Sequence, residues 1–237
     1  MTDNDIAITI QQLQYRWNPQ QPLLLDIEQL EIVKGERVFI KGESGSGKST
    51  LLSLLAGVLE PQQGDIKILN QSITDIKAAA RDRFRADHIG FIFQMFNLLP
   101  YLSVVENVLL PLHFSSQRKQ SIDVPETEAL RLLSHLDMDS PELLSRPVSE
   151  LSVGQQQRVA AARALMGKPE ILIADEPTSA LDTDRREAFI KLLINECNES
   201  NTTLIFVSHD QALEQYFDRS IHLSELNSAA MTTTGGA

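Results

Sequence analysis

The chain has 237 residues, of which 42% are hydrophobic and 22% charged, a composition ordinary for a soluble globular protein with a sizeable core. Acidic residues outnumber lysine and arginine 32 to 21, so the formal net charge is −11, which argues against nucleic acid as a partner. The single cysteine, Cys197, excludes an internal disulfide and indicates a reducing cytoplasm. No stretch reaches the ~20 apolar residues that cross a bilayer, so work at a membrane would require a partner.

The first part of the chain predicts strands that lead into a helix. Residues 6–40 alternate apolar and polar side chains, as β-strands do, with turns between them. Over residues 48–59 the leucines recur three and four positions apart, which predicts a helix. Residues 60–73 then predict a turn and a short hairpin, and residues 88–94 a buried strand.

The second part changes from helices back to strands. Residues 101–167 contain helical runs separated by polar connections. Strands are predicted again at 170–175, 202–208 and 220–224, with a helical run between the first two. A strand, helix, strand order predicts a mostly parallel sheet.

These patterns predict a single α/β domain over residues 1–237. Antiparallel strands at the N-terminus form a β-subdomain beside the parallel core, and the helical run is an insertion. The small, polar composition of the last residues predicts disorder. The expected boundaries are a core at about 1–100 and 168–223, a helical subdomain at about 101–167 and a disordered tail at about 226–237.

A glycine-rich loop between a predicted strand and a predicted helix suggests phosphate binding. Residues 39–50 read FIKGESGSGKST and fit the pattern G-x-x-x-x-G-K-[ST]. The glycines let backbone N–H groups surround phosphate oxygens, the lysine neutralises the β- and γ-phosphates, and the serine hydroxyl holds Mg²⁺. The predicted nucleotide-binding residues of this loop are Gly42, Glu43, Ser44, Gly45, Ser46, Gly47, Lys48, Ser49 and Thr50.

Two carboxylates follow a buried strand later in the chain. Residues 171–177 read ILIADEP, so Asp175 and Glu176 emerge at the carboxyl end of a strand, where parallel sheets bind ligands. We expect Asp175 to bind Mg²⁺ directly or through water, and Glu176 to polarise the attacking water. Such a strand ending is a weak signal by itself. Together with the glycine loop it becomes a strong signal for a site that binds phosphates with Mg²⁺ and activates a water to hydrolyse them.

A third segment resembles the signature motif of ATP-binding cassette (ABC) proteins. Residues 151–165 read LSVGQQQRVAAARAL, and they begin shortly before the strand that ends in the two carboxylates. The resemblance implies that Ser152, Val153, Gly154 and Gln155 bind nucleotide at the N-terminus of a helix. Many members of the family have glycine where this chain has Val153, a β-branched residue with fewer backbone conformations. This difference bears on how tightly the paired domains close.

Other residues match the ABC pattern in chain order, and the resemblance covers about residues 6–223. Gln94 is similar to the family glutamine that contacts Mg²⁺ and senses the transmembrane partner. Asp182 ends SALD, which resembles the loop that crosses between paired nucleotide domains. His209 resembles the switch histidine, which in the family contacts the γ-phosphate. The resemblance therefore implies the catalytic residues Lys48, Gln94, Glu176 and His209 and the metal ligands Ser49, Gln94 and Asp175.

An aromatic residue upstream of the glycine loop completes the expected site. Proteins of the ABC family stack an aromatic ring on adenine at this place in the chain. Trp17 stands where that ring is expected, and Tyr15 is the second choice.

The resemblance also implies two protein partners. Each ABC signature motif completes the nucleotide site of an opposite cassette, so we expect a pair that forms with MgATP, with a second copy or a homologue. Residues 94–112 are apolar for a segment beside an active site, and this region of the family receives a helix of an integral membrane permease. Residues 90–108 most resemble ATPases of the lipoprotein-release, macrolide-export and cell-division group. We expect a mechanotransmission-type exporter or extractor whose ATPase lies on the cytoplasmic face of the inner membrane.

Two other functions are compatible with these motifs. One is a soluble ABC ATPase acting on nucleic acid or ribosomes, although the chain has one cassette, no heptad run and a charge of −11. The other is a scaffold that binds ATP to recruit a membrane partner, with hydrolysis incidental, although Glu176 and His209 are both present. A DNA-stimulated rate would favour the first, and similar slow turnover in wild type and Glu176→Gln would favour the second.

Overall fold

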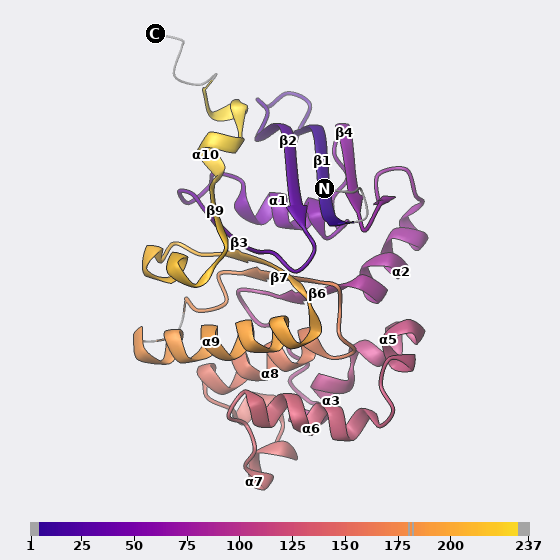
Figure 1. The fold of residues 1–237 in the computed structure, drawn as a ribbon, viewed down its shortest axis with the longest axis vertical. Coiled ribbons are helices and arrows are strands. Elements are labelled where there is room, and N and C mark those ends of the chain that lie inside the picture. The colour runs from indigo at the N-terminus through magenta and orange to yellow at the C-terminus, as the bar shows by residue number, and fades with distance from the viewer. Residues whose placement is uncertain (1–4, 180, 182, 232–237) are drawn as a thin grey trace.

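The computed structural model describes residues 5–179, 181 and 183–231. Its layers are an antiparallel sheet, a helix beneath that sheet, a central parallel sheet, and a group of helices on the far side (Figure 1). Two hydrophobic cores fill the spaces on either face of the parallel sheet. Among the described residues, no helix combines the length and the apolar character needed to span a bilayer.

The parallel sheet forms the centre of the molecule. Its strands lie in the order β6 (Ile89–Ile92), β7 (Ile171–Asp175), β8 (Thr203–Val207), β3 (Arg37–Lys41) and β9 (Arg219–His222). Alternate residues of each strand face opposite cores: Ile171 and Ile173 pack into one, Leu172 and Ala174 into the other. Because both faces are covered, the inner strands β7 and β8 are apolar almost throughout.

The antiparallel sheet packs over helix α1. Its strands lie in the order β2 (Leu25–Val33), β1 (Ile6–Tyr15), β4 (Gln63–Ile68) and β5 (Gln71–Ser72). The register between β1 and β4 shifts between Gln11 and Gln14, and Gly64 opposite has φ +91°. A Cβ at Gly64 would lie 2.3 Å from the carbonyl oxygen of Gln12, so this irregularity requires glycine. α1 (Lys48–Leu55) buries its four leucines in the same core.

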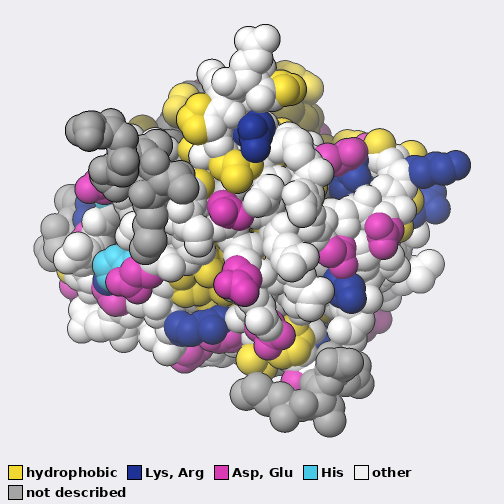
Figure 2. Space-filling view, turned by 90° about the horizontal axis from the view of Figure 1, so that it is seen from above, with side chains coloured by type: hydrophobic (Ala, Val, Ile, Leu, Met, Phe, Trp, Pro, Cys, Tyr) yellow, Lys and Arg dark blue, Asp and Glu magenta, His cyan; other side chains and the backbone are white. Residues whose placement is uncertain are grey.

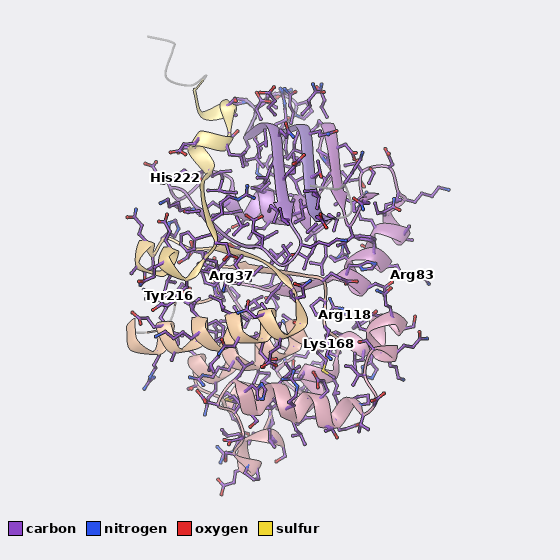
Figure 3. The ribbon with its side chains drawn as sticks, viewed as in Figure 1. Arg37, Arg83, Arg118, Lys168, Tyr216 and His222 are labelled. Carbon is purple, nitrogen blue, oxygen red and sulfur yellow. The ribbon has the colours of Figure 1, made fainter. Side chains whose placement is uncertain are left out.

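Helices fill residues 78–88 and much of 104–200. They are α2 (Ala78–His88), α3 (Val104–Leu109), α4 (Pro111–Phe114), α5 (Ser116–Gln120), α6 (Pro125–His135), α7 (Pro141–Leu144), η2 (Val148–Glu150), α8 (Val153–Leu165) and α9 (Thr183–Ser200). Arg118 in α5 is buried and donates hydrogen bonds to the carbonyl oxygens of Asp87 (3.2 Å) and Met166 (3.3 Å) (Figure 3). This arginine ties α5 to α2 and to the end of α8. Its burial lowers the pKa of the guanidinium to about 10.

The end of the described chain corrects one expectation from the sequence. After η3 (Gln211–Tyr216) and β9, the chain forms α10 (Leu223–Leu226) and η4 (Ser228–Met231). Asn227 and Ala229 are buried there, so residues 226–231 do not form the disordered tail that their small, polar composition predicts. The reason is that Asn227 makes hydrogen bonds to the start of β2, which composition does not reveal. The remainder of the expected tail, 232–237, lies outside the described residues.

Candidate active site

The glycine loop runs from the end of β3 to the start of α1. Gly47 precedes α1 with φ 102°, and a Cβ there would lie 2.9 Å from Leu25 Cδ2. Gly45 has φ +78° with nothing within 4 Å of an added Cβ. Both positions therefore favour glycine, Gly47 for its backbone angle and its close neighbour, Gly45 for its backbone angle alone. No side chain of the described residues caps the start of α1, so its first amides are available to an anion.

Lys48 is buried against the loop that precedes it. Its Nζ donates hydrogen bonds to the carbonyl oxygens of Gly42 (2.7 Å) and Glu43 (2.8 Å). Burial lowers the pKa of Lys48, while the nearby charges of Glu176 and Asp175 act in the opposite direction. The Lys48 ammonium is thus held against the glycine loop, near the two carboxylates at the end of β7.

Asp175 ends strand β7, next to the start of α1. Burial raises the pKa of its carboxyl group, and a hydrogen bond with Ser49 opposes that shift. Its Oδ1 is buried and has no hydrogen-bond partner among the described residues. A buried carboxylate oxygen beside a serine hydroxyl is the donor set that Mg²⁺ prefers, so these two residues fit that ion.

Glu176 and His209 face each other at the ends of β7 and β8. Glu176 has φ 47°, an uncommon backbone angle for a residue with a side chain, and its N–H donates to the carbonyl oxygen of Val207 (3.0 Å). Nε2 of His209 lies 3.0 Å from Oε1 of Glu176. Burial raises the pKa of Glu176, and the His209 charge opposes the shift. A buried carboxylate of raised pKa is suited to accept a proton from water.

One cavity of about 450 Å³ brings most of the predicted residues together, and this volume suits a nucleotide. Gly42, Glu43 and Ser46 instead line a neighbouring cavity of about 740 Å³, which shares Ser44, Gly45 and His209 with the first. Leu24 lines both cavities and was not predicted, because one leucine in an apolar run carries no chemical signal. The first cavity is lined by Trp17, Leu24, Ser44, Gly45, Gly47, Lys48, Ser49, Thr50, Gln94, Glu176, Ser179 and His209.

The two aromatic candidates differ in position. Trp17 is 62% exposed and lines the cavity. Tyr15 is buried in the core of the antiparallel sheet, and its ring meets Trp17 edge-on with 5.3 Å between centroids. Trp17 is therefore the ring that a ligand in the cavity can reach.

The segment that resembles the signature motif lies outside this cavity. Ser152 caps α8: its hydroxyl accepts a hydrogen bond from the N–H of Gln155 (3.3 Å), whose side-chain oxygen accepts one from the N–H of Ser152 (2.9 Å). Val153 is 49% exposed, and a Cβ at Gly154 would meet Leu181 at 3.4 Å. Asp182 lies outside the described residues. The structure thus groups the glycine loop, Gln94, Glu176 and His209, and leaves residues 152–155 apart.

A family model described as ABC transporter matches residues 25–179. The chain belongs to the ABC transporter family. The lipoprotein-releasing system ATP-binding protein LolD of Chromohalobacter salexigens is 37% identical to it over 211 residues, which cover 89% of this chain and 87% of the relative. The ABC transporter ATP-binding protein MJ0796 of Methanocaldococcus jannaschii is 40% identical over 196 residues, with 83% of each chain covered.

Solved structures agree with the assignment of this chain to the ABC family. A dimeric structure of a post-hydrolysis state of MJ0796 bound to ADP and Pi matches it with a TM-score of 0.79 and 34% identity, covering 94% of this chain and 95% of that one. This confirms the predicted α/β fold of ABC type. The sequence relatives confirm the predicted resemblance to the lipoprotein-release group, since LolD proteins are among them. The chain is an ATPase that takes ATP with Mg²⁺.

Proposed function

We propose that this ABC ATPase drives a mechanotransmission-type exporter or extractor. Two copies close on MgATP at the cytoplasmic face of the inner membrane, and their opening after hydrolysis moves a separate membrane permease. One observation carries the proposal: Gln94, which lines the nucleotide cavity, lies beside exposed apolar side chains, so nucleotide and partner meet at one loop. The relatives named as lipoprotein-releasing ATPases support the same group.

The magnesium ligands in this proposal are Ser49, Gln94 and Asp175. Ser49 and Asp175 already lie in hydrogen-bonding reach, and Gln94 lines the same cavity. The ion, when bound, would neutralise negative charge on the phosphates during hydrolysis. Trp17 stacks on the adenine ring, which is the reason for its exposure at the cavity.

The catalytic residues in this proposal act on the γ-phosphate and on the attacking water. Lys48 leaves its carbonyl partners to neutralise phosphate oxygens. Glu176 accepts the proton of the attacking water, and His209 holds Glu176 and the γ-phosphate in register. Gln94 relays the state of this site to the partner.

A second copy supplies the residues that the cavity lacks. Ser152, Val153, Gly154 and Gln155 lie at the N-terminus of α8, where the helix dipole and free amides attract a phosphate. They do not line the cavity of their own chain, so they act on the nucleotide of the opposite copy. Asp182 lies outside the described residues, and the resemblance of its segment to the ABC family implies a contact with the second copy. The dimeric structures of MJ0796 support this arrangement.

The membrane partner docks beside Gln94. Met95 is 82% exposed and Tyr101 is 74% exposed, and Phe93 is exposed next to them in the chain. Exposed large apolar side chains mark surfaces that a protein partner covers. Because Phe96, which follows Met95, is buried in the core with the helices, a partner pressing here contacts a segment anchored to the helical layer.

Light scattering tests the pairing. The Glu176→Gln variant should double its mass with MgATP and remain single with MgADP. Adding Gly154→Asp should abolish the pair while ATP still binds, because the new carboxylate faces the partner's nucleotide. No change of mass with MgATP would contradict the proposal.

Copurification with the membrane permease tests the coupling. Met95→Glu and Tyr101→Glu should abolish copurification and leave basal ATP turnover unchanged. Val58→Glu, at another exposed apolar position, is the matched control and should copurify as wild type. Retention of the permease by both glutamate variants would contradict docking at this loop.

A further inference from the structure

The loop between β1 and β2, residues 16–24, carries Trp17 and is fastened at both ends by amide side chains from distant parts of the chain. At its beginning, the exposed Gln62 accepts a hydrogen bond from the N–H of Arg16 (2.7 Å) and donates one to its carbonyl oxygen (3.1 Å). At its end, Asn227 makes the corresponding contacts with the start of β2. Figure 1 shows this loop and α10 at the same end of the molecule.

Asn227 uses both ends of its amide on β2. Its Nδ2 donates to the carbonyl oxygen of Leu24 (2.8 Å), and its Oδ1 accepts from the N–H of Asp26 (2.7 Å). The side chain is 4% exposed, so water competes little for these hydrogen bonds. The chain reaches this place through α10, which begins directly after His222 at the end of β9 (Figure 3).

Leu24 connects the Asn227 hydrogen bonds to the nucleotide site. Its side chain lines both cavities, and its Cγ lies 3.4 Å from where a Cβ of Gly47 would be. Its N–H donates to the carbonyl oxygen of Tyr15 (2.8 Å), which closes the loop that holds Trp17. The hydrogen bond from Asn227 therefore fixes a residue that lies between the exposed tryptophan and the glycine loop.

At the end of the molecule that bears this loop, seen from above, hydrophobic side chains are exposed among polar and charged ones (Figure 2). The loop carries an exposed tryptophan and ends at two leucines, 24 and 25, that pack against Gly47. The Trp17 ring meets Tyr15 edge-on but is 62% exposed, so its position depends on how the loop backbone is held.

We propose that Asn227 is a positioning residue that holds loop 16–24 so that Trp17 can receive the nucleotide base. The inference rests on the proposed stacking of Trp17 on adenine. Asn227 does not line the cavity that Trp17 lines; it lines the neighbouring cavity. It acts through the Leu24 carbonyl, which makes the C-terminal segment part of the base-recognition machinery.

This role has a signature that a purely structural role lacks. Phosphate binding depends on the glycine loop and Lys48, whereas base binding depends on loop 16–24. Loss of the amide should raise the Kd for MgATP about tenfold, the effect of one well-placed hydrogen bond to a preorganised site. The Kd for magnesium tripolyphosphate, which has no base, should stay within about twofold.

Calorimetric titration of the Glu176→Gln protein, which does not turn over, measures both constants. The test variants are Asn227→Ala and Asn227→Asp. The aspartate keeps the acceptor for Asp26 and loses the donor to Leu24, so it should weaken ATP as alanine does. Asn198→Ala, at an exposed position of α9, is the matched control and should bind both ligands as the parent does. Thermal unfolding identifies any variant that is not folded, and the aspartate variant then carries the test.

The sole tryptophan gives a second readout. Without nucleotide, the fluorescence anisotropy of Trp17 should fall in both Asn227 variants, because the loop moves more freely. Equal weakening of ATP and tripolyphosphate, or no weakening of either, would overturn the inference. Trp17→Ala separates the two proposals. If Trp17→Ala weakens ATP and the Asn227 variants do not, only the role of Asn227 fails. If Trp17→Ala leaves ATP binding unchanged, the stacking proposal fails and this inference fails with it.

Discussion

Replacing Glu176 by glutamine should make the nucleotide-free protein more stable while it abolishes turnover. Glu176 is buried, and burial raises its pKa. Nε2 of His209 lies 3.0 Å from its Oε1, but no group among the described residues donates a well-aligned hydrogen bond to that oxygen. A buried polar atom without a partner costs about 1–3 kcal/mol. Glutamine keeps an oxygen that accepts the hydrogen bond from the backbone N–H of His209, and it removes the buried charge. We therefore expect the free energy of unfolding to rise by about 1 kcal/mol.

The gain should depend on pH in a defined direction. Because the folded-state pKa of Glu176 lies above its ordinary value, the folded state holds this proton more tightly than the unfolded state does. The stability that the protonated group contributes is fully present below the unfolded pKa and is lost as the pH rises through the folded pKa. Glutamine mimics the protonated group at every pH. The difference between the two proteins should therefore be largest at pH 7 and above, and should shrink as the pH falls toward 4.5.

Urea denaturation without nucleotide or Mg²⁺, between pH 7.5 and 4.5, measures this difference. For a chain of this length, about 1 kcal/mol corresponds to a rise in Tm of about 2–4 °C. Glu28→Gln, on an exposed position of β2, is the control and should change stability by less than about 0.5 kcal/mol. A Glu176→Gln protein that is less stable than wild type at pH 7, or a gain that does not change with pH, would refute the reasoning.

Three further predictions concern the scaffold. Cys197 is buried and its burial raises the thiol pKa to about 12, so a disulfide reagent should modify it only after unfolding, as thiol absorbance measures. Gly64→Ala should destabilise the protein by more than about 2 kcal/mol in urea, because the new Cβ meets a backbone carbonyl at a φ of +91°. Arg163→Met should cost about 1–3 kcal/mol and reduce permease-stimulated turnover, because Arg163 donates to the carbonyl oxygens of Phe96 and Asn97 (both 2.6 Å), just after Gln94. Wild-type stability in Gly64→Ala or Arg163→Met, or reactive Cys197 in the native state, would contradict these accounts.

Much of the site could be predicted because its signals are local in the sequence. The glycine loop is recognised from Gly42, Gly47 and Lys48 at fixed spacing, and the structure gives Gly47 the positive φ that favours glycine. Asp175 and Glu176 follow a run of four apolar residues, and such a run predicts a buried strand and thus the place where the carboxylates emerge. The choice between Trp17 and Tyr15 needed the structure, since alternation along β1 and its end does not say which ring leaves the core.

Other parts could not be predicted from local pattern. Helix α2 (Ala78–His88) has no apolar stripe. Its buried side chain is that of Arg81, which pairs with Glu60. A periodicity argument has nothing to detect there. The ordered end of the chain depends on Asn227, whose hydrogen bonds join residues about 200 positions apart in sequence, and composition alone predicts a disordered tail.

The position of β8 has a consequence for how the nascent chain folds on the ribosome. In the finished sheet β8 separates β7 from β3, yet it is translated after both. A nascent polypeptide that has emerged only through β7 already contains the glycine loop and both carboxylates, but the strand that sets their spacing is still missing. ATP can therefore stabilise this site by binding only after β8 has been made and has joined the sheet.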